Sequence, residues 1–259
     1  MLKENRYHPN VLDKFIKKLT LRNFLIVALT SKTYSEVINL YKLNNIRFPF
    51  STENGATFFV PKSNNKQDLV FKQIINKNAT TSDKIIRKID SLPINSKKNI
   101  VFIKDLSFDK QMKITKLKMQ ELEYFNRRNF SVSIIWKGSN YSLFSLKKYL
   151  KRLKLQATFG GKMINISGVH NKLDALIYFK QLYLKNLNME KCITVSIGDS
   201  QNDVEILNYS DYSGIVIRKD KGKIKLIKNH NVFISSKPAP EGWVQLLSKI
   251  NRKMEKEDI

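Results

Sequence analysis

The stretch "SIGDSQNDVEIL", Ser196 to Leu207, decides the fold. It completes the apolar run "CITVSI" with Gly-Asp, and a helical pattern begins a few residues later. A short apolar run of this kind is typical of a strand that is buried on both faces, as in a parallel sheet. Asp199 stands just past the end of this strand, and Asn202 and Asp203 follow. Because open α/β sheets bind ligands beyond the carboxyl ends of their strands, these side chains mark a candidate site.

The same alternation of patterns continues toward the N-terminus. "HPNVLDKFIKKLT" predicts a helix, and "FLIVALT" (24–30) predicts a second strand buried on both faces. "SEVINLYKL" predicts the next helix, and "FPFSTENGATFFV" predicts two short strands that turn at Asn54-Gly55. The order strand, helix, strand indicates an α/β fold with a parallel sheet.

The middle of the chain predicts a separate α/β unit. The strand-like runs "NIVFIK" and "FSVSIIW" are separated by a long helical pattern over 108–128. A further helix, "SLFSLKKYLKRLKL", precedes a strand pair that is broken at Gly160-Gly161. We therefore expect a core formed by residues 1–80 and 167–259, with residues 81–166 inserted between its two parts as a second domain.

Composition narrows the class of protein. The 259 residues carry a formal net charge of +25, but the lysines are spread along the whole chain. No zinc-finger spacing or RNA-binding signature accompanies them, so we expect them to attract a small anionic substrate and not nucleic acid. No run of about 18 apolar residues predicts a membrane span. The single cysteine, Cys192, fits a cytoplasmic protein without disulfides. The sequence predicts no oligomeric state.

The residues after "CITVSI" suit a hard cation. Mg²⁺ typically takes one or two carboxylates together with water and phosphate oxygens. Asp199 is the candidate ligand, and Asn202 and Asp203 either bind the ion as well or fix the orientation of Asp199. The alternative is that Asp199 and Asn202 only cap the helix that follows.

Two other segments offer groups for a phosphate. "TSKT", Thr30 to Thr33, places three hydroxyls and an ammonium at the end of the predicted strand 24–30. Hydroxyls and backbone N–H groups at a helix start bind phosphoryl oxygens. Lys172 begins the helix before "CITVSI", where its ammonium would neutralise charge between a carboxylate and a phosphate. The alternative for Lys172 is an ordinary exposed lysine.

Together these residues resemble a known superfamily. Thr30, Lys172 and "GDSQND" in this order look like motifs two, three and four of the haloacid-dehalogenase phosphatases. "TSKTYSEVINLYKLNNIRFPFSTENGATFFVP" is similar to the mannosyl-3-phosphoglycerate phosphatase family, and "RNFS", "GGK" and "PAPEGW" resemble its later motifs. Val132 and Ser133 stand where that family has Glu and Pro, and Lys162 stands where it has Arg.

The resemblance implies a Rossmann-like core with a mobile α/β cap domain and Mg²⁺-dependent hydrolysis of a sugar-phosphoglycerate. It implies that Thr30 binds the phosphoryl oxygens, that Lys172 stabilises the charge of the intermediate, and that Asp199 binds Mg²⁺. Asn202 and Asp203 would complete or support the metal site. The substrate would be met by Ser31, Lys32, Glu53, Asn54, Arg128, Gly160, Gly161 and Lys162. Lys162 keeps the positive charge of the family's Arg, but it lacks the two parallel hydrogen bonds that Arg donates to a carboxylate or a phosphate.

The first motif of the superfamily, D-x-D-G-T after an apolar strand, does not occur in this sequence. It carries the nucleophile and the general acid. We expect a start codon placed too late, because losing a central strand would leave buried backbone groups unpaired at about 1–3 kcal/mol each. DNA upstream of Met1 should then encode this motif in frame. The alternatives are a silent phosphosugar- or nucleic-acid-binding protein, and a phosphatase for sucrose phosphate or glucosyl-phosphoglycerate.

Overall fold

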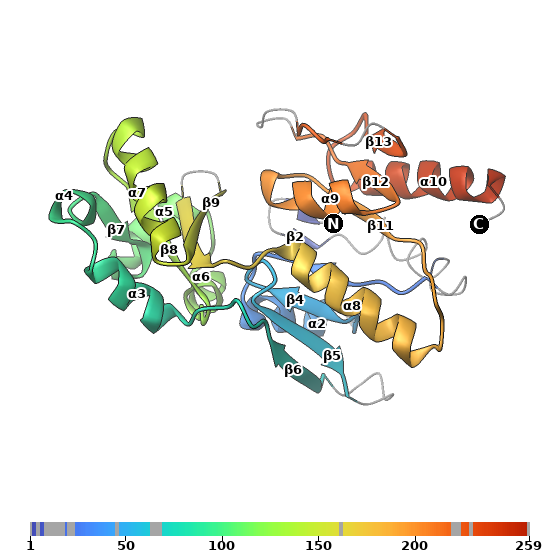
Figure 1. The fold of residues 1–259 in the computed structure, drawn as a ribbon, viewed down its shortest axis with the longest axis horizontal. Helices are drawn as coiled ribbons and strands as arrows, with labels where there is room; N and C mark the ends of the chain where they lie inside the picture. Colours follow the sequence, from blue (N-terminus) through green and yellow to red (C-terminus); the bar gives the residue numbers. More distant parts are fainter. Residues whose placement is uncertain are drawn as a thin grey trace. The chain divides into compact units, whose positions relative to one another are not determined.

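The computed structural model shows two compact units (Figure 1). It describes residues 2–3, 6–7, 19, 24–44, 47–62, 69–160, 163–218, 224–227 and 230–257. One unit comprises residues 28–175, and the other comprises residues 1–27 together with 176–259. The helix expected over 8–20 lies outside the described residues except for Leu19. The proposed domain limits at 80 and 166 remain a prediction.

The unit of residues 28–175 contains two four-stranded sheets. The first has the order β3-β4-β5-β6, in which β3 and β4 are parallel and the other pairs are antiparallel. Its strands are β3 (Ala28–Leu29), β4 (Phe50–Thr52), β5 (Thr57–Pro61) and β6 (Phe71–Ile75), and helix α2 (Tyr34–Asn44) follows β3. Phe50 and Phe59 stack at 4.7 Å between ring centroids and pack with Val37 and Tyr41 of α2.

The second sheet is antiparallel in the order β7-β8-β10-β9. Its strands are β7 (Ile100–Phe102), β8 (Ser131–Trp136), β9 (Leu155–Gly160) and β10 (Met163–Gly168). The helices around it are α3 (Ser82–Asp90), α4 (Ile94–Lys97), the 3-10 turn η1 (Ile103–Asp105), α5 (Phe108–Thr115), α6 (Met119–Asn126) and α7 (Asn140–Arg152). Ile134 and Ile166 bury one face of the sheet against Leu146 and Leu150 of α7.

The other unit is built on the parallel sheet β11-β12-β13. Its strands are β11 (Val195–Gly198), β12 (Tyr212–Ile215) and β13 (Val232–Ile234), with η2 (Gln201–Asp203), α9 (Val204–Tyr209) and α10 (Glu241–Lys256) around them. The short strands β1 (Leu2–Lys3) and β2 (Arg6–Tyr7) pair with each other. Helix α8 (Lys172–Asn186) begins in one unit and ends in the other. Tyr212 packs on Ile250 and Met254 of α10.

The α/β fold is confirmed, but two elements differ from their predictions. Only Ala28 and Leu29 of the apolar run 24–30 form a strand, and Leu25 is 52% exposed. The prediction of a strand over 24–30 with both faces buried was wrong, because in the described residues the pairing with β4 covers only Ala28 and Leu29. The helix predicted over 108–128 is two helices, α5 and α6, since Lys116 takes a left-handed φ of 59°. The break allows Leu117 and Leu122 to pack in one cluster with Ile103.

None of the helices in the described parts of the chain combines the length and the apolar character that a membrane crossing requires.

Candidate functional site

The loop after β3 carries the "TSKT" sequence and begins helix α2. The backbone N–H of Lys32 donates to Thr30 Oγ1 at 3.1 Å. Thr33 and Glu36 form a reciprocal cap: Thr33 Oγ1 accepts from the N–H of Glu36 at 3.2 Å, and Glu36 Oε2 accepts from the N–H of Thr33 at 2.8 Å. The local T-x-x-E spacing was a signal for this cap that the sequence analysis missed.

Not every polar group of this loop is available to a phosphate. Thr33 is fully buried, and its hydroxyl donates to the carbonyl of Tyr124 at 2.8 Å. The ammonium of Lys32 lies 2.9 Å from Glu36 Oε1. The expectation that three hydroxyls of this loop serve a phosphate is therefore wrong for Thr33. Thr30 and Ser31 supply the remaining hydroxyls.

A strained turn lies against this loop. Glu53, Asn54 and Gly55 have φ values of 46°, 61° and 94°, in the left-handed region. The N–H of Glu53 donates to the carbonyl of Lys32, and the N–H of Asn54 donates to the carbonyl of Thr30, both at 2.9 Å. A Cβ on Gly55 would lie 2.0 Å from the carbonyl oxygen of Asn171. The turn therefore fits between the Thr30 loop and the residue that precedes Lys172.

Lys172 stands at the capped start of helix α8. Asn171 and Asp174 cap this helix reciprocally: Asn171 Oδ1 accepts from the N–H of Asp174 at 3.0 Å, and Asp174 Oδ2 accepts from the N–H of Asn171 at 3.1 Å. Asn76 Nδ2 lies 3.0 Å both from Asp174 Oδ2 and from the carbonyl oxygen of Gly55. Lys172 is only 8% exposed, so its interpretation as an ordinary exposed lysine is wrong.

His170 joins the turn to the start of α8. The ring is buried, and its Nε2 lies 3.0 Å from the carbonyl oxygen of Glu53. Burial lowers the pKa of His170 below its ordinary value of 6.5, although the backbone groups of Glu53 and Asn78 and the carboxylates of Glu53 and Asp174 favour the protonated ring. A neutral imidazole therefore helps to hold the backbone beside Lys172.

Glu53 binds the start of strand β8. Its buried carboxylate accepts hydrogen bonds from the N–H groups of Asn129 and Phe130, each at 3.0 Å. The hydroxyl of Ser131 donates to Glu53 Oε2 at 2.6 Å. Three donors from β8 and the residues before it thus already occupy this carboxylate, which was predicted to meet the substrate.

Arg128 lies in the same cluster. Its Nη1 donates to the carbonyl of Ser31 at 3.3 Å and to the hydroxyl of Ser131 at 3.2 Å. Its guanidinium carbon lies 4.3 Å from the ring centroid of Phe125, which is cation–π geometry. The structure therefore brings Arg128 together with Ser31 and, through Ser131, with Glu53.

A polar row of side chains continues from Ser131 along the second sheet. Asn165 of β10 pairs with Ser133 of β8 and with Thr158 of β9. The hydroxyl of Ser133 donates to Asn165 Oδ1 at 2.6 Å. Gly160 ends β9 beyond this row, whereas Gly161 and Lys162 lie outside the described residues. Because side chains alternate along a strand, these polar groups face away from the apolar cluster around Ile134.

Asp203 organises the loop after β11. Its buried Oδ2 accepts hydrogen bonds from the N–H groups of Asp199 and Ser200, both at 3.1 Å, and from the Ser200 hydroxyl at 2.9 Å. Ser200 and Asp203 form the capping box of η2. The alternative in which Asp199 and Asn202 cap this helix is therefore wrong. A Cβ on Gly198 would lie 2.4 Å from Asp203 Cβ, so the carboxylate packs tightly under the loop.

Asp199 itself is partly exposed and forms an ion pair. Arg218 Nη1 donates to Asp199 Oδ2 at 3.2 Å, and both side chains are about a third exposed or more. Nothing in the local sequence pointed to Arg218, which lies beyond the end of β12. Asn202 accepts a hydrogen bond from the Ser200 hydroxyl. The described residues contain no group of three His, Cys, Asp or Glu side chains that alone would hold a metal ion.

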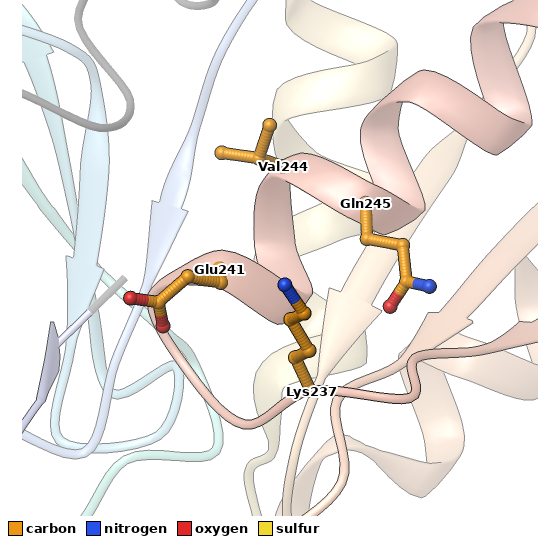
Figure 2. A pocket seen from close by; sticks show the side chains of 4 residues that line it. All are labelled: Lys237, Glu241, Val244 and Gln245. Atoms are coloured by element: carbon orange, nitrogen blue, oxygen red, sulfur yellow. The ribbon is translucent and has the colours of Figure 1, made fainter.

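A hollow of about 320 Å³ opens at the start of α10 (Figure 2). Lys237, Glu241, Val244 and Gln245 line it. The oxygen of the Gln245 amide already accepts from the N–H of Ser236 at 2.8 Å. None of the side chains predicted to bind substrate or metal lines this hollow, and we assign it no role.

The structure has an α/β fold in which the parallel sheet β11-β12-β13 and the mixed sheet β3-β4-β5-β6 are accompanied by the antiparallel sheet β7-β8-β10-β9. The sequence profile of the haloacid dehalogenase-like hydrolases matches residues 1–237, and the chain belongs to that family. The resemblance noted in the sequence is thereby confirmed at the level of the superfamily.

Individual relatives agree with this assignment. The chain is 24% identical to a glucosyl-3-phosphoglycerate/mannosyl-3-phosphoglycerate phosphatase of Persephonella marina, over 93% of this chain and 90% of the relative. A haloacid dehalogenase-like hydrolase of B. subtilis shares the fold with a TM-score of 0.64 and 14% identity, covering 95% of both chains. A phosphatase of the same superfamily from Bacteroides thetaiotaomicron has a TM-score of 0.59 and 13% identity, covering 92% of this chain and 86% of its own.

Proposed function

We propose that the chain is a phosphatase that hydrolyses the phosphate monoester of a small, polar, anionic substrate. The observation that carries this proposal is the meeting of three segments in one compact unit. The Thr30 loop, the turn at Glu53–Gly55 and the start of α8 at Lys172 contact one another through backbone hydrogen bonds and close packing. They gather hydroxyls, backbone N–H groups and a buried ammonium, which are the groups that bind phosphoryl oxygens.

Lys172 has the central role in this proposal. Its ammonium stands at the start of α8, the positive end of the helix dipole, so a phosphate bound there would meet both positive charges. Thr30 and Ser31 would donate their hydroxyls to the same phosphate. The reciprocal cap of Asn171 and Asp174 fixes the backbone at the start of α8. It would thereby fix the direction from which the Lys172 ammonium approaches the phosphate.

Asp199 fits Mg²⁺ as one carboxylate of a site that phosphate oxygens and water would complete. The bound ion would neutralise charge on the phosphate and polarise its phosphorus–oxygen bonds. Asp203 would hold the loop in place, as its three hydrogen bonds already do. Arg218 would have to release Asp199 when the ion binds.

The attacking carboxylate of the superfamily reaction belongs to its first motif, and the upstream D-x-D-G-T remains a prediction. In the described part of the chain β3 and β11 are each the terminal strand of their sheet. Each therefore has an edge at which an additional parallel strand is able to pair. The cytoplasmic location also remains a prediction.

For the substrate we propose a sugar-phosphoglycerate. The name of the Persephonella marina relative supports this choice at 24% identity. The polar row of Ser133, Asn165 and Thr158 offers hydrogen bonds to sugar hydroxyls, and Arg128 offers charge to a glycerate carboxylate. We propose that Glu53 positions Arg128 through Ser131, since its carboxylate is occupied by donors from the start of β8.

A panel of phosphate esters tests this proposal. The chain, produced both from Met1 and with any codons that lie in frame upstream of Met1, would be incubated with Mg²⁺ and mannosyl-3-phosphoglycerate, glucosyl-3-phosphoglycerate or sucrose phosphate, and released phosphate would be measured. We expect hydrolysis of a sugar-phosphoglycerate, and a loss in kcat on the order of 100-fold for Lys172→Ala. Lys84→Ala, an exposed lysine of α3, serves as the control. Absence of hydrolysis from every ester, or full activity of Lys172→Ala, would reject the proposal.

The second candidate is a phosphosugar-binding protein without catalysis. The observation that favours it is that the Thr30 loop and the buried Lys172 offer groups that bind a phosphate, a role that requires no nucleophile. Calorimetry distinguishes the two candidates. Binding of the ester with no release of phosphate, by every form of the chain that is produced, would establish this second function.

A further inference from the structure

Helix α7 presents a face that the proposed hydrolysis does not use. Its inner side is committed to the core, where Leu146 and Leu150 are completely buried. On its outer side Tyr141 is 83% exposed and Phe144 is 58% exposed. We call the outer side the α7 surface; its residues are Tyr141, Phe144, Lys147, Lys148 and Lys151, together with Phe159 of the neighbouring strand β9.

Aromatic rings and ammonium groups alternate on the α7 surface. Lys147 Nζ lies 4.4 Å from the ring centroid of Phe159, and Lys148 Nζ lies 4.6 Å from that of Phe144. Phe159 is 50% exposed. Each of these two rings therefore carries a positive charge beside an accessible edge or face, which is cation–π geometry at the protein surface.

The charge of the α7 surface is not balanced along the chain. No Asp or Glu occurs between Glu123 and Asp174, a segment that includes β8, α7, β9 and β10. The acidic residues nearby in sequence belong to α3, η1, α5 and α6; they are Asp83, Asp90, Asp105, Asp109, Glu121 and Glu123. The stretch of chain that carries α7 (Figure 1) therefore contributes lysines and arginines but no carboxylate.

We propose that the α7 surface binds single-stranded nucleic acid. Exposed rings stack on bases, and lysines beside them neutralise the phosphates between those bases. A membrane surface fits less well, because α7 has already buried its apolar side in the core of the sheet. The expectation of no nucleic-acid partner was based on the absence of known motifs and on lysines spread along the chain, whereas this surface concentrates charge and aromatic rings in one place.

The test is fluorescence anisotropy of the full chain with labelled single-stranded RNA and DNA of mixed sequence. Three lysine contacts predict about a 20-fold loss of affinity between about 50 and 200 mM salt. The charge variant is Lys148→Glu/Lys151→Glu, and its matched control is Lys110→Glu/Lys113→Glu on the exposed side of α5. The stacking variant is Tyr141→Ala/Phe144→Ala. Thermal melting confirms that each variant is folded.

We expect the charge variant and the stacking variant each to lose about tenfold or more in affinity while the α5 control keeps the affinity of the wild type. Equal losses in the charge variant and the control would overturn the proposal, since diffuse charge would then explain binding. If inorganic polyphosphate binds with the same affinity as the oligonucleotides, or if the stacking variant keeps the affinity of the wild type, the bases do not contribute to binding. Either result would also overturn the proposal. Binding to anionic phospholipid vesicles without binding to oligonucleotides would overturn it in favour of a membrane surface.

Discussion

Glu53 and Ser131, far apart in the sequence, are joined by a hydrogen bond of 2.6 Å between Oε2 and the serine hydroxyl. Glu53 belongs to the turn between β4 and β5, and Ser131 begins β8 of the other sheet. Because Asn129 and Phe130 also donate to this carboxylate, one buried side chain holds a whole segment of the cap against the core portion of the same unit.

Replacement of Glu53 should loosen that segment. Glu53→Ala would leave two N–H groups and one hydroxyl without their acceptor, which we expect to cost on the order of 3 kcal/mol in the free energy of unfolding. Urea denaturation measures the loss, and hydrogen exchange of the Asn129 and Phe130 amides should become faster. Glu123→Ala on the exposed side of α6 is the control and should change stability little. Unchanged exchange at Asn129 would show that Glu53 does not hold this segment.

Gly55 should tolerate no side chain. Its φ of 94° is unfavourable for alanine, and the added Cβ would meet the carbonyl of Asn171 at 2.0 Å. We expect Gly55→Ala to lower stability by about 2 kcal/mol or more and to disturb the backbone beside Lys172. Gly214→Ala is the comparison, because the nearest atoms to its Cβ would be side-chain carbons of Ile197 and Leu246 at 3.1 Å. Thermal melting of both variants tests this prediction, and an equal melting temperature for the two variants would contradict it.

The stability of the protein should depend on pH through His170. Its folded pKa lies below 6.5, so the unfolded chain binds more protons in the interval just below that value. Stability is therefore complete above about pH 6.5 and decreases as the pH falls through this interval. His170→Gln retains an amide donor for the Glu53 carbonyl and should flatten the slope of Tm between pH 7.5 and 5.5. A slope that is the same in the variant would assign the effect to other groups.

Arg218 should compete with Mg²⁺ for Asp199. The pair is partly exposed, so we expect Arg218→Gln to change the free energy of unfolding by less than about 1 kcal/mol. Removing the guanidinium should strengthen Mg²⁺ binding, which the rise of Tm with Mg²⁺ concentration would measure. Asp199→Asn should abolish that rise. A Tm that responds to Mg²⁺ equally in wild type and Asp199→Asn would place the ion elsewhere.

The parts of this site that could be predicted are those that local sequence encodes. Apolar runs that end in polar residues identified Thr30 and Asp199 as residues at the ends of strands, and the turn at Asn54-Gly55 was evident from its residue types. The T-x-x-E cap of Thr33 also had a local signal, but it was read as a set of phosphate ligands.

The remaining features arise from contacts between distant segments. Nothing near Glu53 indicates that its carboxylate binds Ser131, and nothing near Asp199 indicates Arg218. The break at Lys116 escaped prediction because neither Gly nor Pro marks it; burial of Leu117 and Leu122 around Ile103 accompanies it. Tertiary packing decided each of these features, and a local pattern does not record it.

Within residues 28–175 the chain passes from the sheet β3-β4-β5-β6 to the sheet β7-β8-β10-β9 after Asn76, and it returns before Asp174. The two connecting segments lie in contact. A Cβ on Gly168 would lie 2.4 Å from the carbonyl oxygen of Asn78, and Asn76 reaches Asp174 at 3.0 Å. The two ends of the segment between these contacts therefore lie side by side. Because both ends of this long segment are anchored at one place, its length adds little to the entropic cost of closing it.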